Sequence, residues 1–297
     1  MNRFDIGDIA VHRIEEWHGN FTSPGSLFSG YDEASFQRHR DLFASGYYDP
    51  DADMIHAFLQ SWVLEVDGLK VLYDTGAGNA KNRPGIPIFG NLDTDFLLNL
   101  AAAGFSPDDI DLVVCSHLHI DHVGWNTVLE AGEWVPTFRN ARYLFSATDF
   151  DFWNPENAAK YPDKIGALVN AGVFEDSVAP VFAAGVVELV DRRHSPCAGL
   201  RLEAAPGHTP GHLVMKVESA GESAIFVADI LHHPAQVFYP DWNSVFCEHP
   251  EQARRTRREV LAWAARSGAT VVPAHFGGAH VCTVRENGNG FEPVLPA

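Results

Sequence analysis

The chain has few cysteines and no long apolar run. Its four cysteines, at positions 115, 197, 247 and 282 of 297 residues, are far apart and include no CxxC pair. Neither a thiolate zinc site nor a disulfide framework is therefore indicated, and free buried thiols are the expectation. No stretch of about 18 or more apolar residues occurs, and the N-terminus has no basic region followed by an apolar one. We therefore expect a cytoplasmic protein that does not span a membrane.

Basic residues are also scarce. There are 21 Lys and Arg residues against 39 Asp and Glu residues, which gives a formal net charge of −18. This charge repels polyanions and argues against nucleic acid or an anionic membrane as the partner. A small substrate that is neutral or weakly charged fits better.

The composition is that of a globular protein, because 46% of the residues are apolar and 20% are charged. No internal repeat or low-complexity tract divides the chain. We therefore predict one domain over residues 1–297.

Short apolar runs alternate with helical patterns along most of the chain. Residues 59–66 and 69–73 predict two strands joined at Asp67-Gly68, a dipeptide that tolerates the positive φ of a tight hairpin turn. Further strands are predicted at 111–115, 186–190, 200–204, 213–217 and 224–228. Helices are predicted at 94–103, 146–153, 158–171 and 251–266. The expected class is thus a mixture of strands and helices, α/β or α+β.

Residues 1–57 show no clear helical or strand period but are rich in aromatic side chains. Core packing is the plainer interpretation of these side chains. Their irregular spacing also permits a lid over a pocket or a dimerisation segment, so a homodimer is a second expectation. The aromatic residues concerned are Trp17, Phe21, Phe28, Tyr31, Phe36, Phe43, Tyr47 and Tyr48.

Four potential metal ligands stand within six residues, directly after the apolar run 111–115. His117, His119, Asp121 and His122 form an HxHxDH pattern. Imidazole nitrogens and carboxylate oxygens suit zinc and its first-row neighbours. A polar surface loop is the alternative, but three histidines so close together favour a metal centre.

Three later residues complete the ligand set that such a centre needs. His208 stands in the turn Gly207-His-Thr-Pro-Gly-His212, Asp229 ends the predicted strand 224–228, and His275 follows the strand-like stretch 269–273. Each of them lies where a strand gives way to a loop. Ligands at several strand ends along one sheet edge can converge on a common point.

These motifs, in this order and at these spacings, resemble those of the metallo-β-lactamase superfamily of binuclear metallohydrolases. The resemblance extends from the turn Asp74-Thr75-Gly76 to His275. It implies a four-layer αβ/βα sandwich, with two mixed sheets flanked by helices and the active site at one edge of the sheets. Local patterns alone predict only a mixture of strands and helices.

The resemblance also implies how the ligands are shared. His117, His119 and His208 would hold one metal ion, and Asp121, His122 and His275 the other, with the Asp229 carboxylate bridging the two. The implied cofactors are two divalent ions, most simply zinc, with iron or manganese as alternatives. Such a pair can lower the pKa of a shared water enough to supply hydroxide at neutral pH.

The implied reaction is hydrolysis of a lactone or a related activated ester, with Asp121 and His232 as candidate catalytic residues. His232 lies three residues after Asp229, where acyl-homoserine lactonases of the superfamily have a tyrosine. An imidazole can also donate a proton to a leaving oxygen. However, the exchange weakens the homoserine-lactone assignment, and the surrounding segments resemble the methyl parathion hydrolase branch.

Two alternative reactions stay open. One is hydrolysis of an organophosphate or aryl ester at the same centre. The other, of a different class, is a mononuclear iron dioxygenase acting on a thiol persulfide. A protein that holds metal without catalysis is the weakest interpretation of a complete ligand set.

Several other residues have local interpretations. Asp74 is either a simple turn residue or a hydrogen-bond acceptor for a ligand imidazole, and His212 is expected to pack near the site without being a ligand. The arginines at 254, 255, 257 and 258 are expected on the wet face of a helix. Core packing is the plainer interpretation of Trp125, Phe238, Tyr239 and Trp242, which are also candidate pocket walls.

Overall fold

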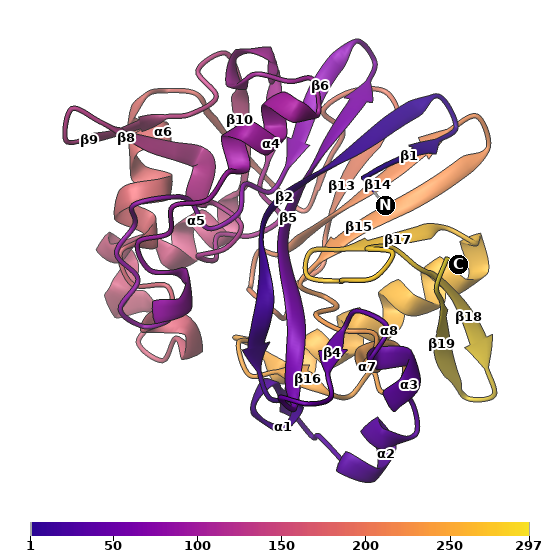
Figure 1. Cartoon of the computed structure of the whole chain (residues 1–297). Coiled ribbons are helices and arrows are strands. Elements are labelled where there is room, and N and C mark those ends of the chain that lie inside the picture. The colour runs from indigo at the N-terminus through magenta and orange to yellow at the C-terminus, as the bar shows by residue number, and fades with distance from the viewer. Residues whose placement is uncertain (1, 297) are drawn as a thin grey trace.

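Two mixed β-sheets face each other in the computed structural model, which describes residues 2–296 (Figure 1). The larger sheet has the order β1-β2-β5-β6-β7-β10-β11, with β4 paired to β5, and the smaller has the order β12-β13-β14-β15-β17. The strands of the larger sheet are β1 (Arg3–Ile6), β2 (Ile9–Thr22), β4 (Tyr48–Asp49), β5 (Met54–Val66), β6 (Leu69–Tyr73), β7 (Leu112–Val114), β10 (Arg142–Ser146) and β11 (Val187–Val190). Those of the smaller sheet are β12 (Arg193–His194), β13 (Leu200–Ala204), β14 (Leu213–Ser219), β15 (Glu222–Ala228) and β17 (Thr270–Pro273).

Three short ribbons and several helices complete the fold. The ribbons are β3 (Phe28–Ser29) with β16 (Asn243–Ser244), β8 (Thr127–Glu130) with β9 (Glu133–Pro136), and β18 (Thr283–Asn287) with β19 (Gly290–Val294). The helices are α1 (Pro24–Leu27), α2 (Glu33–Gln37), α3 (Arg40–Phe43), α4 (Phe96–Ala102), α5 (Ala147–Trp153), α6 (Ala179–Ala183), α7 (Ala235–Phe238) and α8 (Pro250–Ser267). Short 3-10 turns are η1 (Pro87–Phe89), η2 (Pro107–Asp109), η3 (Gly124–Asn126), η4 (Pro155–Lys160) and η5 (Ile165–Ala167), and η6 (Phe174–Val178) is a π-helical turn.

The apolar side chains define four layers. Along β7, Leu112 and Val114 point into the cluster between the two sheets, whereas Val113 points into the cluster beneath α4 and α5. The smaller sheet behaves likewise, since its outer face packs with Leu261 of α8. Strands covered on both faces give the near-continuous apolar runs seen in the sequence. The predicted αβ/βα sandwich is confirmed.

Most of the predicted strands and helices are present. The turn between β5 and β6 has positive φ at both Asp67 (52°) and Gly68 (75°), as the dipeptide predicted. Helix α8 ends at Gly268, which adopts the left-handed conformation with φ of 66°.

The helix predicted at 158–171 is wrong. This stretch contains only the 3-10 turns η4 and η5 with irregular backbone between them. Pro162 has no N–H to donate and disfavours helical geometry at the residue before it. The apolar residues whose spacing suggested a helix instead belong to an irregular segment, and its backbone at Leu168 lies close to Gly85 of a neighbouring loop.

Strand β2 was not predicted, although it has 14 residues and pairs with β5 along most of its length. Two register shifts, between Glu15 and Trp17 and between Asn20 and Thr22, interrupt its alternation. A bulge moves the following side chains to the opposite face, so no single period of two runs through the strand.

Most of the N-terminal aromatic residues pack in a separate cluster, formed by α1, α2, α3 and the first residues of β4 and β5 (Figure 1). Phe28, Phe36, Phe43 and Tyr48 are buried there against Trp242. This is the core packing that was the plainer expectation. The single domain over 1–297, and residues 1–57 as a lid or dimerisation segment, stay predictions.

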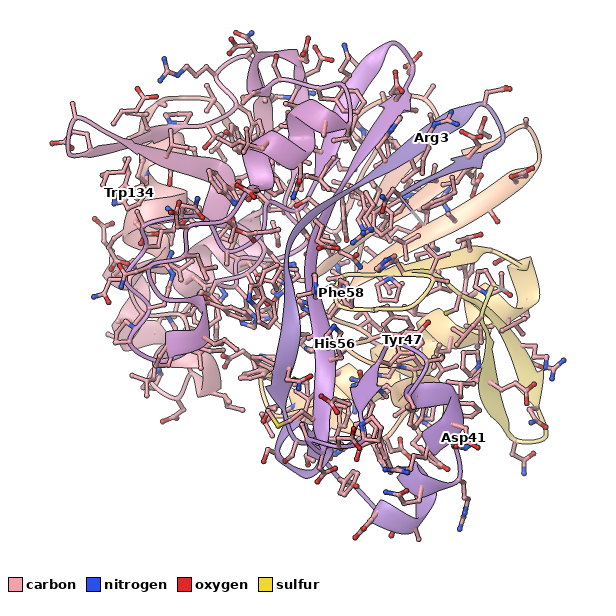
Figure 2. The ribbon with its side chains drawn as sticks, viewed as in Figure 1. Arg3, Asp41, Tyr47, His56, Phe58 and Trp134 are labelled. Atoms are coloured by element: carbon pink, nitrogen blue, oxygen red, sulfur yellow. The ribbon has the colours of Figure 1, made fainter. Side chains whose placement is uncertain are left out.

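The N-terminal segment is joined tightly to the chain that follows β17. In Figure 2, Tyr47 lies beside β5, along which His56 and Phe58 are placed. A Cβ added to Gly277 would lie 2.0 Å from the Gly46 carbonyl oxygen and 2.7 Å from the ring of Phe58. Within residues 2–296, no helix combines the length and apolar character needed to cross a membrane.

Replacing Gly277 with Ala should destabilise the fold, because the new methyl group forces the backbones at 46 and 277 apart. We expect a loss of about 1–3 kcal/mol, as for overpacking in a filled core, measured as a lower midpoint of urea unfolding. Gly25→Ala is the matched control, since its Cβ would meet only the Tyr31 ring at 3.4 Å. Equal midpoints for the two variants would contradict the contact.

Candidate metal centre

The HxHxDH residues lie in the loop after β7, a central strand paired in parallel with β6 and β10. His117, His119 and His122 are buried, and Asp121 is partly exposed. His208 lies in the turn between β13 and β14, Asp229 directly follows β15, and His275 follows β17. The structure therefore brings together seven residues from the C-terminal ends of four strands.

The seven side chains form two groups. Within each group, the potential ligand atoms all lie within 4.8 Å of one another. One group is His117, His119, His208 and Asp229, and the other is Asp121, His122 and His275. The two groups contain the seven residues expected from the sequence, with Asp229 placed in the first group, and they are consistent with a binuclear metal site.

The Asp229 carboxylate faces both groups. Its Oδ2 lies 3.1 Å from His208 Nε2 and 3.9 Å from His117 Nε2. Its Oδ1 lies 3.1 Å from His122 Nε2 and 3.0 Å from His275 Nε2. Each oxygen thus faces the imidazoles of one group, as a carboxylate that bridges two ions would.

The polar atoms at the centre fit divalent ions. His117 Nε2, His122 Nε2 and Asp229 Oδ1 are buried without any hydrogen-bond partner among the described residues. Leaving buried polar atoms unpaired is costly. Several of them converging beside two carboxylates is the pattern expected of groups that bind a cation.

Hydrogen bonds on the outer side of the rings aim these nitrogens at the centre. His122 Nδ1 donates to Asp74 Oδ2 over 2.9 Å, and Ser116 Oγ donates to the same oxygen, also over 2.9 Å. Since its one proton is used, Ser116 Oγ accepts from His117 Nδ1, 2.9 Å away. His275 Nδ1 donates to the Phe58 carbonyl over 2.9 Å. In the neutral form of these rings, which metal binding requires, the inward Nε2 atoms are therefore the unprotonated ones. Of the two interpretations of Asp74, the hydrogen-bonded one is confirmed.

Burial keeps one group of imidazoles neutral. It lowers the pKa of His119 and of His208 to about 3, and that of His117 well below its usual range. Neutral imidazole is the form that binds metal. For Asp229, burial alone would raise the pKa, but the surrounding imidazoles outweigh burial and hold the pKa well below its ordinary value. This group thus combines neutral nitrogens with an ionised carboxylate. In the other group, burial is outweighed by the neighbouring carboxylates, which raise the pKa of His122 and His275.

His212 packs beside the site without joining either group, as expected. Its ring centroid lies 5.0 Å from that of His117.

Asp149 is a site residue that the sequence did not reveal. Its carboxylate accepts hydrogen bonds from Leu118 N (3.2 Å), Thr209 Oγ1 (2.7 Å) and Gly211 N (2.6 Å), and burial raises its pKa to about 6. It thereby ties the HxHxDH loop to the turn of His208. Its position three residues after the N-cap Ser146 suggests only a capping residue, so the sequence carries no clear signal of this role.

Glu16 in β2 holds the loop that follows β6 and the turn η3. It accepts from Ala77 N (2.6 Å), Gly78 N (2.9 Å) and Trp125 Nε1 (2.7 Å), and burial raises its pKa to about 7. The adjacent pair Glu15-Glu16 breaks the alternation of the strand and could have drawn attention to it.

Arg257 does not lie on the solvent-exposed face of α8, so the expectation is wrong for this arginine. It is 1% exposed and donates to the carbonyls of Ile230 (2.7 Å) and Pro240 (2.7 Å), which holds the chain just after Asp229. Its spacing from Ala253 and Leu261 places it on the apolar face of α8. Arg255 and Arg258 are exposed and Arg254 is partly exposed.

His232 and His233 point to opposite sides. His232 lines a pocket above the two groups, with Nε2 3.2 Å from Asp229 Oδ2. His233 is turned into the N-terminal aromatic cluster, 4.7 Å from Phe43 between ring centroids.

The pocket opens to solvent, and its walls are mainly apolar. One wall comes from the N-terminal part of the chain and includes Phe21, Leu27, Ile55, Ala57 and Leu59. The rest includes Ile86, Phe89, Val169 and Phe246.

None of the four aromatic residues considered as candidate walls lines the pocket, so that expectation is wrong. Trp125 stacks on Phe96 and donates to Glu16. Tyr239 and Trp242 stack on each other, and Phe238 stacks on His39. All four pack in the protein, as the plainer interpretation held.

Comparison with known proteins gives consistent matches. A family model described as the metallo-beta-lactamase superfamily matches residues 58–275. An N-acyl homoserine lactonase of Bacillus thuringiensis is 23% identical over 177 residues, which are 56% of this chain and only 60% of that protein. A probable metallo-hydrolase of Methanocaldococcus jannaschii is 33% identical over 75 residues, which are 25% of this chain and 32% of that protein.

Two solved structures share the fold over nearly the whole length. The hydrolase AbOPH of the beta lactamase superfamily has a TM-score of 0.83 at 23% identity, covering 99% of this chain and 97% of that one. AidC, described as a dizinc quorum-quenching lactonase in complex with a product, has a TM-score of 0.80 at 21% identity, with coverage of 99% and 97%.

Removing metal should destabilise the protein, because the convergent lone pairs and carboxylates then lie buried without a cation. We expect about two ions per chain by elemental analysis. Full chelation should lower the thermal midpoint by an amount equivalent to about 4 kcal/mol when the ion is supplied at about 1,000 times its Kd. Asp229→Ala should bind fewer ions and respond little to chelator. A wild-type midpoint that does not change on chelation would contradict the site.

Proposed function

We propose, since the chain belongs to the metallo-beta-lactamase superfamily, that this metallo-hydrolase opens a lactone ring or cleaves a related activated ester. The observation that carries the proposal is the apolar pocket directly above the two ligand groups. Asp121 and Asp229, both in those groups, are its only charged lining residues within 2–296, and it has no lysine or arginine. A neutral substrate with an apolar portion suits such walls.

The seven residues divide the work of holding the ions. His117, His119 and His208 would bind one ion, Asp121, His122 and His275 the other, and Asp229 both. Two bound divalent ions would supply a water of lowered pKa and polarise the carbonyl of the substrate. Asp74, Ser116 and the Phe58 carbonyl keep the rings oriented, and the apolar walls exclude bulk water.

His232 is proposed to hold the proton that the leaving oxygen needs. Burial lowers its pKa, so the ring is neutral at pH 7 and has one N–H donor. Gln236 Oε1 accepts from the His232 backbone N–H over 2.6 Å and so holds the residue in place. Neither ring nitrogen makes a regular hydrogen bond among the described residues, although Nε2 lies 3.2 Å from Asp229 Oδ2. With the Asp229 carboxylate bound to the two ions, the ring N–H would be available to a substrate.

A phosphotriester or aryl ester is the second candidate substrate, because the same neutral, apolar pocket would accept it. The persulfide dioxygenase alternative requires one iron per chain, so elemental analysis separates it from a centre with two ions, of zinc or of mixed metals. A homodimer formed through residues 1–57 remains a proposal.

Substrate profiling tests the proposed reaction. We expect kcat/KM for simple lactones to exceed that for paraoxon about 100-fold, or about 2.7 kcal/mol in transition-state stabilisation, because the proposed reaction is attack on a planar carbonyl carbon and not on a tetrahedral phosphorus. Rates would be followed by pH-indicator assay for lactones and by p-nitrophenol release for paraoxon. The reverse preference would establish the phosphotriesterase alternative.

Replacing His232 with Ala should lower kcat about 10²–10⁴-fold, the usual contribution of a positioned proton donor. Metal content should stay unchanged, because His232 belongs to neither ligand group. His233→Ala is a poor control because His233 is packed in the aromatic cluster, so His249→Ala serves instead. An unchanged kcat in His232→Ala would remove this residue from the mechanism.

A further inference from the structure

One side of the pocket is formed by a segment with almost no regular structure. Gly166 and Val169 line the pocket, whereas Ile165 and Leu168 between and beside them are exposed, at 52% and 68%. The only regular element is the three-residue turn η5. Irregular backbone needs hydrogen-bond partners from elsewhere in the protein to keep its position.

Glu248 supplies these partners. Its Oε2 accepts from Ile165 N over 2.8 Å and its Oε1 accepts from Gly166 N over 2.6 Å. The side chain is nearly buried, at 7% exposed. Hydrogen bonds to an ionised carboxylate are about twice as strong as neutral ones, so one residue fixes two successive peptides of the wall.

The same segment is connected to both ligand loops, on one side through Glu248 and on the other through Asn170. The Glu248 backbone N–H donates to the His208 carbonyl over 2.8 Å. At the other end, Asn170 Nδ2 donates to the Leu118 carbonyl, in the HxHxDH loop, over 2.9 Å. The distance between the wall and the ligand groups is thus set by direct bonds to the two ligand loops.

The wall is closely packed at two points. A Cβ added to Gly166 would lie 2.9 Å from Glu248 Oε1 and 3.8 Å from His119 Nε2. A Cβ added to Gly85, on the neighbouring loop, would lie 2.1 Å from the Leu168 carbonyl oxygen. When the Glu248 bonds are lost, these two peptides are no longer held in place beside the ligand loops.

We propose that Glu248 is a positioning residue that sets how large an apolar group the substrate can place between the 165–169 segment and the metal centre. The inference rests on the proposed function, because that function places the substrate in this pocket. Without the carboxylate, two backbone N–H groups lose their acceptor, the segment is no longer fixed, and it can yield to larger groups.

Glu248→Ala and Glu248→Gln test this in the metal-loaded protein. The ratio of kcat/KM for p-nitrophenyl octanoate to that for p-nitrophenyl acetate should rise at least five-fold in Glu248→Ala, through KM, and less in Glu248→Gln, which keeps one acceptor oxygen. Hydrogen exchange at the amides of residues 165 and 166 should rise at least ten-fold in Glu248→Ala, with metal content unchanged.

Glu251→Ala is the control, because Glu251 is exposed on the first turn of α8 and pairs only with Arg254 among the described residues. An acyl-length ratio or an exchange rate equal to wild type in Glu248→Ala would overturn the proposal. If that variant does not fold, Glu248→Gln decides by the same two measurements.

The proposed function can fail separately. If wild type hydrolyses none of the esters or lactones, the reaction is wrong, and the wall is then tested by hydrogen exchange and by binding of the uncharged fluorophore N-phenyl-1-naphthylamine. Tighter binding to Glu248→Ala than to Glu251→Ala, with faster exchange, would support the role in the wall. Equal binding and exchange would refute it.

Discussion

The Asp229 carboxylate is the point on which the rest of the site depends. It is buried, and imidazoles of both ligand groups lie about 3 Å from its two oxygens. An isolated buried carboxylate is expensive, so this position is tolerable only beside compensating charge. Four strands from two sheets end around it, and the sandwich can be understood as the framework that holds those strand ends together.

The residues behind the ligands come from distant parts of the chain. Asp149 joins the loop of His119 to the turn of His208, Arg257 holds the backbone after Asp229, and Glu16 fixes the loop behind the site. Each is a buried ionisable group whose hydrogen bonds are mostly to backbone N–H or C=O groups. Such bonds position irregular loops that have no sheet or helix of their own.

The N-terminal part of the chain has two roles in this arrangement. Strand β5 carries Phe58 (Figure 2), whose carbonyl accepts a hydrogen bond from His275. Strands β2 and β5 also supply one wall of the pocket. The aromatic residues beyond them are largely core. The substrate pocket and the metal centre are therefore built jointly, and changes in this segment should affect both.

The sequence by itself determined which residues form the two candidate ligand groups and the class of fold, because short motifs place these residues next to strand ends and because buried strands give apolar runs. It did not reveal β2, whose bulges break the period, nor the irregular course of residues 158–171, where Pro162 interrupts a helical spacing. Only the tertiary structure decided that Arg257, Asp149 and Glu248 face inward and which apolar residues line the pocket. These roles depend on partners that are distant in the sequence, and the local sequence pattern around a residue does not indicate such partners.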